Sequence, residues 1–121
     1  MCYQNSSLIH LCLKFTYPKK QNKTIALYPR DCFQIDFFYV NEICEDNNGV
    51  QYIFSAIDVF TKRGFCVPQV KCDAANAVNS LKIIFNSINV RPKTIVSDVG
   101  PEFDNKKFKK YLGDIGVNLT F

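Results

Sequence analysis

The stretch that decides the fold lies between residues 32 and 40 and reads Cys32-Phe33-Gln34-Ile35-Asp36-Phe37-Phe38-Tyr39-Val40. Its aromatic and β-branched residues are typical of a β-strand. Because side chains alternate along a strand, Gln34, Asp36 and Phe38 share one face. An ionised carboxylate in such an apolar strand is costly to desolvate unless a cation meets it. Asp36 is therefore a candidate metal ligand.

A second acid ends another strand-like run, which reads Thr94-Ile95-Val96-Ser97-Asp98-Val99-Gly100-Pro101-Glu102-Phe103. A divalent ion shared by Asp36 and Asp98 would meet the charge of both, and hard oxygen ligands suit Mg²⁺ or Mn²⁺. The alternative for Asp36 is a buried acid that backbone donors or a nearby lysine satisfy. Asp58 is a rival ligand, but we interpret it as structural because it precedes a turn, where an aspartate commonly caps local amides. Glu102 has unsuitable spacing, and we interpret it as a solvated loop acid.

The rest of the chain predicts an α/β fold. Strands are expected at residues 32–40, 51–60, 65–70, 93–98 and 117–121, with one helix from an Asp73 N-cap through Ile88 and another capped by Asp104 and ended by Gly116. Short connections make the first three strands an antiparallel meander, and the intervening helix lets the fourth run parallel to the first. Adjacent strands lie about 4.8 Å apart, so Asp36 and Asp98 would meet at one site.

Positive charge gathers in two parts of this single-domain chain of 121 residues with a net charge of +4. One group precedes the first acid: Lys14, Lys19, Lys20, Lys23 and Arg30. We expect residues 1–30 to form a basic, poorly structured arm, and residues 31–121 to form the domain. The other group lies on the second predicted helix: Lys106, Lys107, Lys109 and Lys110. These lysines are candidates for binding nucleic acid beside the metal, and the alternative is a solvated helix face.

Other classes of site are disfavoured by the composition. The six cysteines form no CxxC pair and His10 is the single histidine, so no four-ligand zinc module of familiar spacing can be assembled. We expect free, buried thiols. The start of the chain lacks the features of a secretory signal peptide, and no apolar run approaches the ~20 residues of a membrane span. The expected setting is intracellular and reducing, either nuclear or inside an element-encoded or viral particle, with no membrane partner.

Four ordered blocks of sequence between Asp31 and Phe121 resemble a known family. They are Phe33-Gln34-Ile35-Asp36, Tyr52-Ile53-Phe54-Ser55-Ala56-Ile57-Asp58-Val59-Phe60-Thr61-Lys62, Asp98-x-Gly100-x-Glu102-Phe103 and Phe108-x-x-Tyr111-Leu112-x-x-x-Gly116-Val117. Together they resemble the catalytic core of retroviral and retrotransposon integrases, which are RNase H-like polynucleotidyl transferases. The resemblance implies an RNase H-like mixed five-stranded sheet with packed helices, incomplete at its C-terminal end.

The resemblance also implies a chemistry. Asp36 and Asp98 match the first two acids of the family's D,D-35-E triad. Members of the family use this triad to process a DNA 3′ end and to transfer the strand by two-metal phosphodiester transesterification. The glutamate of the triad would fall beyond Phe121, and Val99 stands where the family usually has Asn. We therefore expect a truncated core that holds Mg²⁺ or Mn²⁺ weakly and is inactive alone, and whether the chain is an enzyme is left open.

The implied partners are DNA and, since family cores usually dimerise, a second copy or an intact integrase. A different class of function remains as an alternative: a non-catalytic module that keeps the fold in order to bind nucleic acid or an integrase. An RNase H-like nuclease is a third reading, and the integrase-type loop from Asp98 to Phe103 argues against it.

Overall fold

The computed structural model describes residues 26–40 and 49–121, and the backbone of residues 9–12. Its elements in chain order are β1 (Ile9–Cys12), β2 (Cys32–Tyr39), β3 (Tyr52–Asp58), β4 (Arg63–Gln69), α1 (Ala74–Ile88), β5 (Thr94–Val96), α2 (Lys106–Asp114) and β6 (Asn118–Thr120). Residues 41–48, which connect the first two predicted strands, lie outside the described residues.

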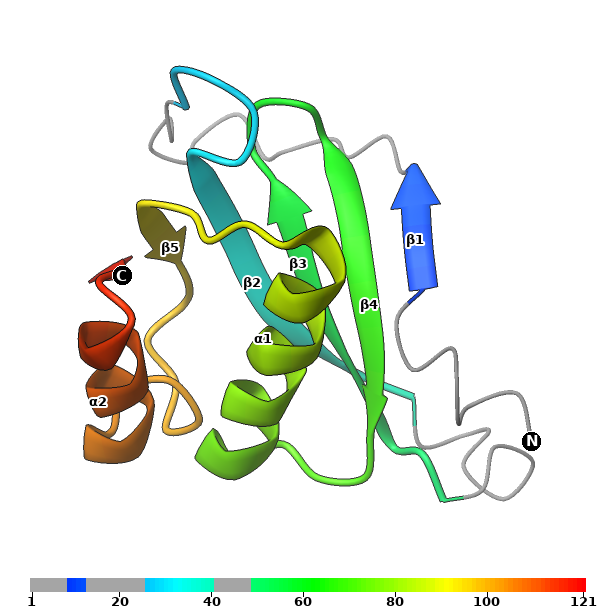
Figure 1. Cartoon of the computed structure of the whole chain (residues 1–121). Helices are drawn as coiled ribbons and strands as arrows, with labels where there is room; N and C mark the ends of the chain where they lie inside the picture. Colours follow the sequence, from blue (N-terminus) through cyan, green and yellow to red (C-terminus); the bar gives the residue numbers. More distant parts are fainter. Residues whose placement is uncertain (1–8, 13–25, 41–48) are drawn as a thin grey trace.

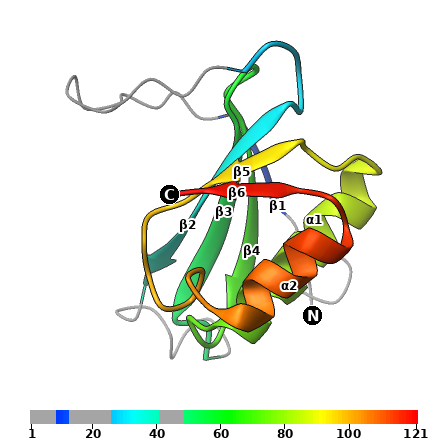
Figure 2. The same cartoon turned by 90° about the vertical axis from the view of Figure 1, so that its left-hand side faces the viewer.

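One mixed sheet organises these elements, with the strand order β1-β4-β3-β2-β5-β6. Strands β2, β3 and β4 form the predicted antiparallel meander, β5 runs parallel to β2, and β6 runs parallel to β5. Both helices cover the same face of the sheet (Figures 1 and 2). The α/β fold with five strands predicted from the sequence is therefore confirmed.

The sheet has one strand more than the sequence predicts. Residues Ile9 to Cys12, which belong to the expected N-terminal arm, form β1 and pair antiparallel with residues 63–66 of β4. The strand covers part of an edge that would otherwise present unpaired backbone groups to solvent. Side chains in β1, His10 among them, lie outside the described part of the chain.

Local capping explains where the helices begin. Asp73 is the N-cap of α1, as predicted, and its side chain accepts a hydrogen bond from the backbone N–H of Asn76. For α2 the predicted cap, Asp104, is wrong by one residue: Asn105 has the extended backbone of a cap and accepts from the N–H of Phe108. The reason is the preceding turn, because the N–H of Asp104 donates to the carbonyl of Gly100.

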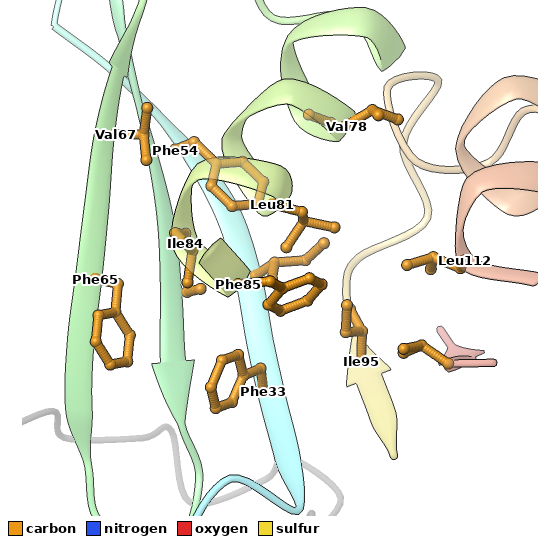
Figure 3. Close-up of a cluster of buried hydrophobic side chains, with 14 of the residues drawn as sticks. Phe33, Phe54, Phe65, Val67, Val78, Leu81, Ile84, Phe85, Ile95 and Leu112 are labelled. Carbon is orange, nitrogen blue, oxygen red and sulfur yellow. The ribbon is translucent and has the colours of Figure 1, made fainter. Parts of the chain in front are cut away.

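The core lies between the helices and the sheet (Figure 3). Phe33 of β2 is fully buried, and its ring centroid lies 6.0 Å from that of Phe65 in β4 and 6.4 Å from that of Phe85 in α1. The apolar side of α1 is buried as its helical spacing predicts, at Ala77, Val78, Leu81, Ile84, Phe85 and Ile88. The aromatic core therefore fixes β2, the strand that carries Asp36.

Candidate metal centre and nucleic-acid interface

Asp36 and Asp98 are brought together by the pairing of β2 with β5. Gln34 lies opposite Val96 in this parallel pair, and two further residues along each strand lead to Asp36 and Asp98. Because β5 ends at Val96, Asp98 lies two residues past its end, while Asp36 lies within β2. Asp36 is half-buried and Asp98 is exposed. The fold thus brings the end of β5 next to the part of β2 that leads to Asp36.

The electrostatics of Asp36 show how closely the acids are grouped. Burial raises the pKa of Asp36 above its usual range, and the carboxylates of Asp98 and Glu102 raise it further, against the lowering effect of a hydrogen bond from the Phe37 N–H. That hydrogen bond is 2.8 Å long and ends on Oδ1 of Asp36. The ionised form of Asp36 is thus disfavoured by its surroundings, and a nearby cation would reverse this preference.

Glu102 lies nearer to this group than its sequence position indicates. It is half-buried, and its carboxyl group folds back over Gly100, where an added Cβ would come within 2.8 Å of both carboxylate oxygens. Glycine at residue 100 therefore leaves the space that the Glu102 carboxyl group occupies. Sequence spacing alone could not reveal this contact, because it depends on the path of the loop.

The donor chemistry of Asp36 and Asp98 fits a hard divalent ion, because both offer carboxylate oxygens. Within residues 26–40 and 49–121, however, no group of three or more His, Cys, Asp or Glu side chains is arranged to hold a metal. The described residues thus fit Mg²⁺ or Mn²⁺ in ligand type and supply two carboxylates from the strands.

Asp58 has the structural role that the sequence predicts. Its side chain is 3% exposed, and its oxygens accept hydrogen bonds from the N–H groups of Phe60, Thr61 and Arg30 at 2.9, 3.3 and 2.8 Å. It pairs with Phe33, an odd number of positions before Asp36, so the two aspartates point to opposite faces of the sheet. Asp58 caps the turn after β3 and anchors the entry to β2.

Three cysteines fall within the described side chains, and each is a free thiol. Cys32 and Cys66 are buried, as expected, whereas Cys72 is half-buried. The pKa of Cys72 is raised to about 11, first by burial and then by the negative charges of Glu102, Asp73 and Asp36. Cys72 is therefore a neutral thiol at physiological pH.

The four lysines of α2 are all exposed but differ in their contacts. Nζ of Lys109 lies 2.6 Å from Oδ1 of Asp104, and Nζ of Lys110 lies 3.6 Å from Oδ2 of Asp114. Lys106 and Lys107 enter neither ion pair. The helix face is thus partly neutralised at Lys109 and Lys110, and its open charge lies in the first turn.

Lys71 was not singled out in the sequence analysis, and the structure places it just after the carboxyl end of β4. Lys71 is exposed, follows β4 by two residues and precedes the N-cap of α1 by two. Hydrogen bonds from Asn76 lower the pKa of Asp73, and the charges of Lys71 and Lys107 lower it further. The sequence feature that could have identified Lys71 is its position between the end of a predicted strand and the predicted N-cap Asp73.

The ends of three strands and the starts of both helices lie toward one edge of the sheet. Strands β2, β4 and β5 run in the same direction, so their carboxyl ends lie at the same edge. The first turns of α1 and α2 lie side by side toward that edge in Figure 1. Ligand sites of open α/β sheets commonly occupy this position.

The profile of the integrase core domain family matches residues 27–121, and the chain belongs to this family. The chain is 35% identical over 75 residues to an uncharacterised transposon-derived protein of Caenorhabditis elegans, in an alignment that covers 62% of this chain and 26% of that protein. The chain thus spans about a quarter of this curated relative.

Two solved structures share the fold. The simian T-cell lymphotropic virus intasome in complex with the PP2A regulatory subunit B56 gamma matches with a TM-score of 0.69 and 19% identity, over 79% of this chain and 35% of that chain. The HTLV-2 integrase catalytic core domain in complex with magnesium matches with a TM-score of 0.67 and 15% identity, over 79% and 62%. The described helices include none long and apolar enough to cross a membrane.

Proposed function

We propose that this chain acts in DNA integration, with Asp36 and Asp98 as the strand carboxylates that hold Mg²⁺ or Mn²⁺ for phosphodiester transesterification. The observation that carries the proposal is the parallel register of β2 with β5, in which Gln34 lies opposite Val96, two residues before each acid. Membership of the integrase core domain family supports the reaction class. Bound divalent ions would supply activation of the attacking oxygen and charge stabilisation of the leaving oxygen.

The residues of the chain have separate roles in this proposal. Asp36, held by the backbone N–H of Phe37 on the buried strand β2, offers a rigid carboxylate. Asp98, exposed just past the end of β5, offers a carboxylate on the more accessible side. Because the described residues supply two carboxylates in place of the family's three, we infer that the ion is held weakly and that strand transfer needs a third acid.

The metal assignment is tested with Mn²⁺ and two matched variants. We expect Asp36→Asn to abolish Mn²⁺ binding measured by titration calorimetry, because the amide keeps the shape of the side chain but loses its charge. Asp114→Asn removes an equal charge from the exposed far end of α2 and should leave binding intact. Mn²⁺ binding that survives in Asp36→Asn would show that the metal assignment is wrong.

A second candidate is a non-catalytic module that binds DNA or an integrase. The observation that favours it is the lack of a three-ligand metal cluster within the described residues, beside an exposed group of lysines. Under this candidate, DNA affinity persists without divalent ions and falls steeply with salt. If the module instead binds an integrase core, that association should vary little with salt. The partner would be a second copy of this chain or an intact integrase. The dimeric form of the HTLV-2 integrase core supports this possibility.

A further inference from the structure

Two exposed lysines from different elements lie near the starts of the two helices. Lys71 lies in the connection between β4 and α1, and Lys107 lies in the first turn of α2. Asp73, the N-cap of α1, follows Lys71 by two residues, and its pKa is lowered first by hydrogen bonds from Asn76 and then by the charges of both lysines. Helices α1 and α2 pack side by side, which brings these two short segments together at the carboxyl edge of the sheet (Figure 1).

The ammonium groups of this pair are accessible to a further anion. Direct ion pairs among the described residues join Lys109 to Asp104 and Lys110 to Asp114, and neither Lys71 nor Lys107 takes part in one. Asp73 uses Oδ1 for both of its hydrogen bonds with Asn76, at 2.8 and 2.7 Å. The direct contacts of the Asp73 carboxylate are therefore with the first turn of α1, and its charge acts on the two lysines only at longer range.

The lysine pair borders the acidic group. The start of α2 is tied to the loop that follows Asp98, because Nδ2 of Asn105 donates to the carbonyl of Pro101 at 2.7 Å. Beside Lys71, the pKa of Cys72 is raised first by burial and then by the charges of Glu102, Asp73 and Asp36. A nucleic acid that approaches Asp36 and Asp98 meets repulsion from several carboxylates. Positive side chains at the rim of the same edge offset this repulsion on the phosphates next to the reacting one.

We propose that Lys71 and Lys107 together bind backbone phosphates of DNA next to the phosphodiester that Asp36 and Asp98 address, with Asp73 as their counter-charge in the free protein. This inference rests on the proposed function and assigns phosphate binding to one pair of lysines from two elements. Lys109 and Lys110 are excluded from it because each already has a carboxylate partner. The contacts are to phosphate and so are independent of base sequence.

The first experiment measures affinity for a fluorescent DNA duplex by anisotropy over a series of KCl concentrations, with EDTA present so that metal binding makes no contribution. A lysine that contacts phosphate releases about 0.9 of a counterion, so Lys71→Gln and Lys107→Gln should each reduce the slope of log K against log salt by about 0.9. At 0.1 M salt this equals about an eightfold loss of affinity. Arg63→Gln, at the first residue of β4 and therefore at the opposite end of that strand from Lys71, should leave the slope unchanged.

A second variant moves affinity in the opposite direction. Asp73→Asn keeps a side-chain oxygen that caps α1, since Asn and Asp are equally good N-caps, but removes the counter-charge. We expect tighter DNA binding by Asp73→Asn than by Asp114→Asn, the matched charge removal at the far end of α2. Thermal melts of all variants verify that each is folded.

The outcomes separate the two proposals. If the folded wild-type chain binds no DNA at low salt, both this inference and DNA binding in the proposed function fail. If wild type binds but Lys71→Gln and Lys107→Gln match Arg63→Gln, the lysine pair is wrong while the proposed function stands. If the two variants weaken self-association in sedimentation velocity and leave DNA binding unchanged, the pair belongs to a protein contact and the inference is overturned.

Discussion

Asp36 shows how a single residue balances folding against function. Its strand buries part of the carboxyl group, and two further carboxylates, from Asp98 and Glu102, act on it. Each of these influences disfavours the negative charge, yet a negative charge is what attracts a cation. The ionised Asp36 side chain therefore lowers the stability of the protein at neutral pH, and the same charge is what would bind a cation.

The pH dependence of stability should reveal this balance. The folded-state pKa of Asp36 is raised above its ordinary value of 3.8, so its contribution to stability is greatest at low pH and is lost as pH rises through the raised pKa. We expect Asp36→Asn to melt at a higher temperature than wild type at pH 7, with the difference shrinking as pH falls toward 3.8. Differential scanning calorimetry measures this, and a lower melting temperature for Asp36→Asn at pH 7 would contradict it.

Asp58 illustrates an acid whose role is purely structural. Three backbone N–H groups donate to its side chain, which is 3% exposed, so Asp58→Ala removes the acceptor of three part-buried hydrogen bonds. Each hydrogen bond contributes about 0.5–1.5 kcal/mol, and we expect a total loss of roughly 3 kcal/mol in the free energy of unfolding. Urea denaturation measures the loss, and Asp114→Ala on the exposed end of α2 is the control. A loss as small as that of the control would refute the capping role.

At the scale of elements, each helix begins where a side chain satisfies its first free N–H groups. The cap of α2 also binds the preceding loop, because Nδ2 of Asn105 donates to the carbonyl of Pro101 at 2.7 Å. Since this loop follows Asp98, the start of α2 and the position of the second acid are linked. The helix cap thus helps to shape the candidate site.

Substitution of neighbouring residues distinguishes the true cap of α2 from the predicted one. Asn105→Ala should lower the free energy of unfolding by about 1 kcal/mol, the usual cost of losing an N-cap. Asp104→Ala removes an exposed ion pair with Lys109, which contributes about 0–1 kcal/mol. We expect its cost in the free energy of unfolding to be smaller than that of Asn105→Ala. Chemical denaturation of both variants tests the assignment. An Asp104→Ala loss larger than that of Asn105→Ala would restore Asp104 as the cap.

At the scale of the whole molecule, one aromatic core joins the sheet to its helices. Phe33 contacts rings from β4 and α1, and so it connects three elements that are distant in the chain. The same strand presents Asp36 on its opposite face. Packing on one side of the sheet therefore holds the carboxylate on the other.

Removal of this central ring should destabilise the entire fold. Phe33→Ala deletes a fully buried side chain and should cost about 3–5 kcal/mol, a large part of the roughly 5–15 kcal/mol that stabilises a typical domain. Phe60→Ala, at an aromatic residue that is 49% exposed, should have little effect. Thermal unfolding followed by circular dichroism compares the two. Similar melting temperatures for both variants would place the centre of the core elsewhere.

Much of the fold could be predicted because it depends on neighbours in the chain. Alternation along β2 identified the face of Asp36, and helical spacing identified the buried side of α1. The parallel pairing of β5 with β2 followed from the helix between them. These features arise from periodicity and short connections, which can be recognised from the order of residues in the sequence.

The remaining features depend on contacts between distant residues. By itself, the sequence determined five of the six strands, both helices and the two aspartates proposed as ligands. Only the tertiary structure decided that β1 joins β4, that the Glu102 carboxyl group folds back over Gly100, and that α1 and α2 pack against each other. The physical reason is that charge and edge pairing act through space, so their partners are set by the packing of whole elements.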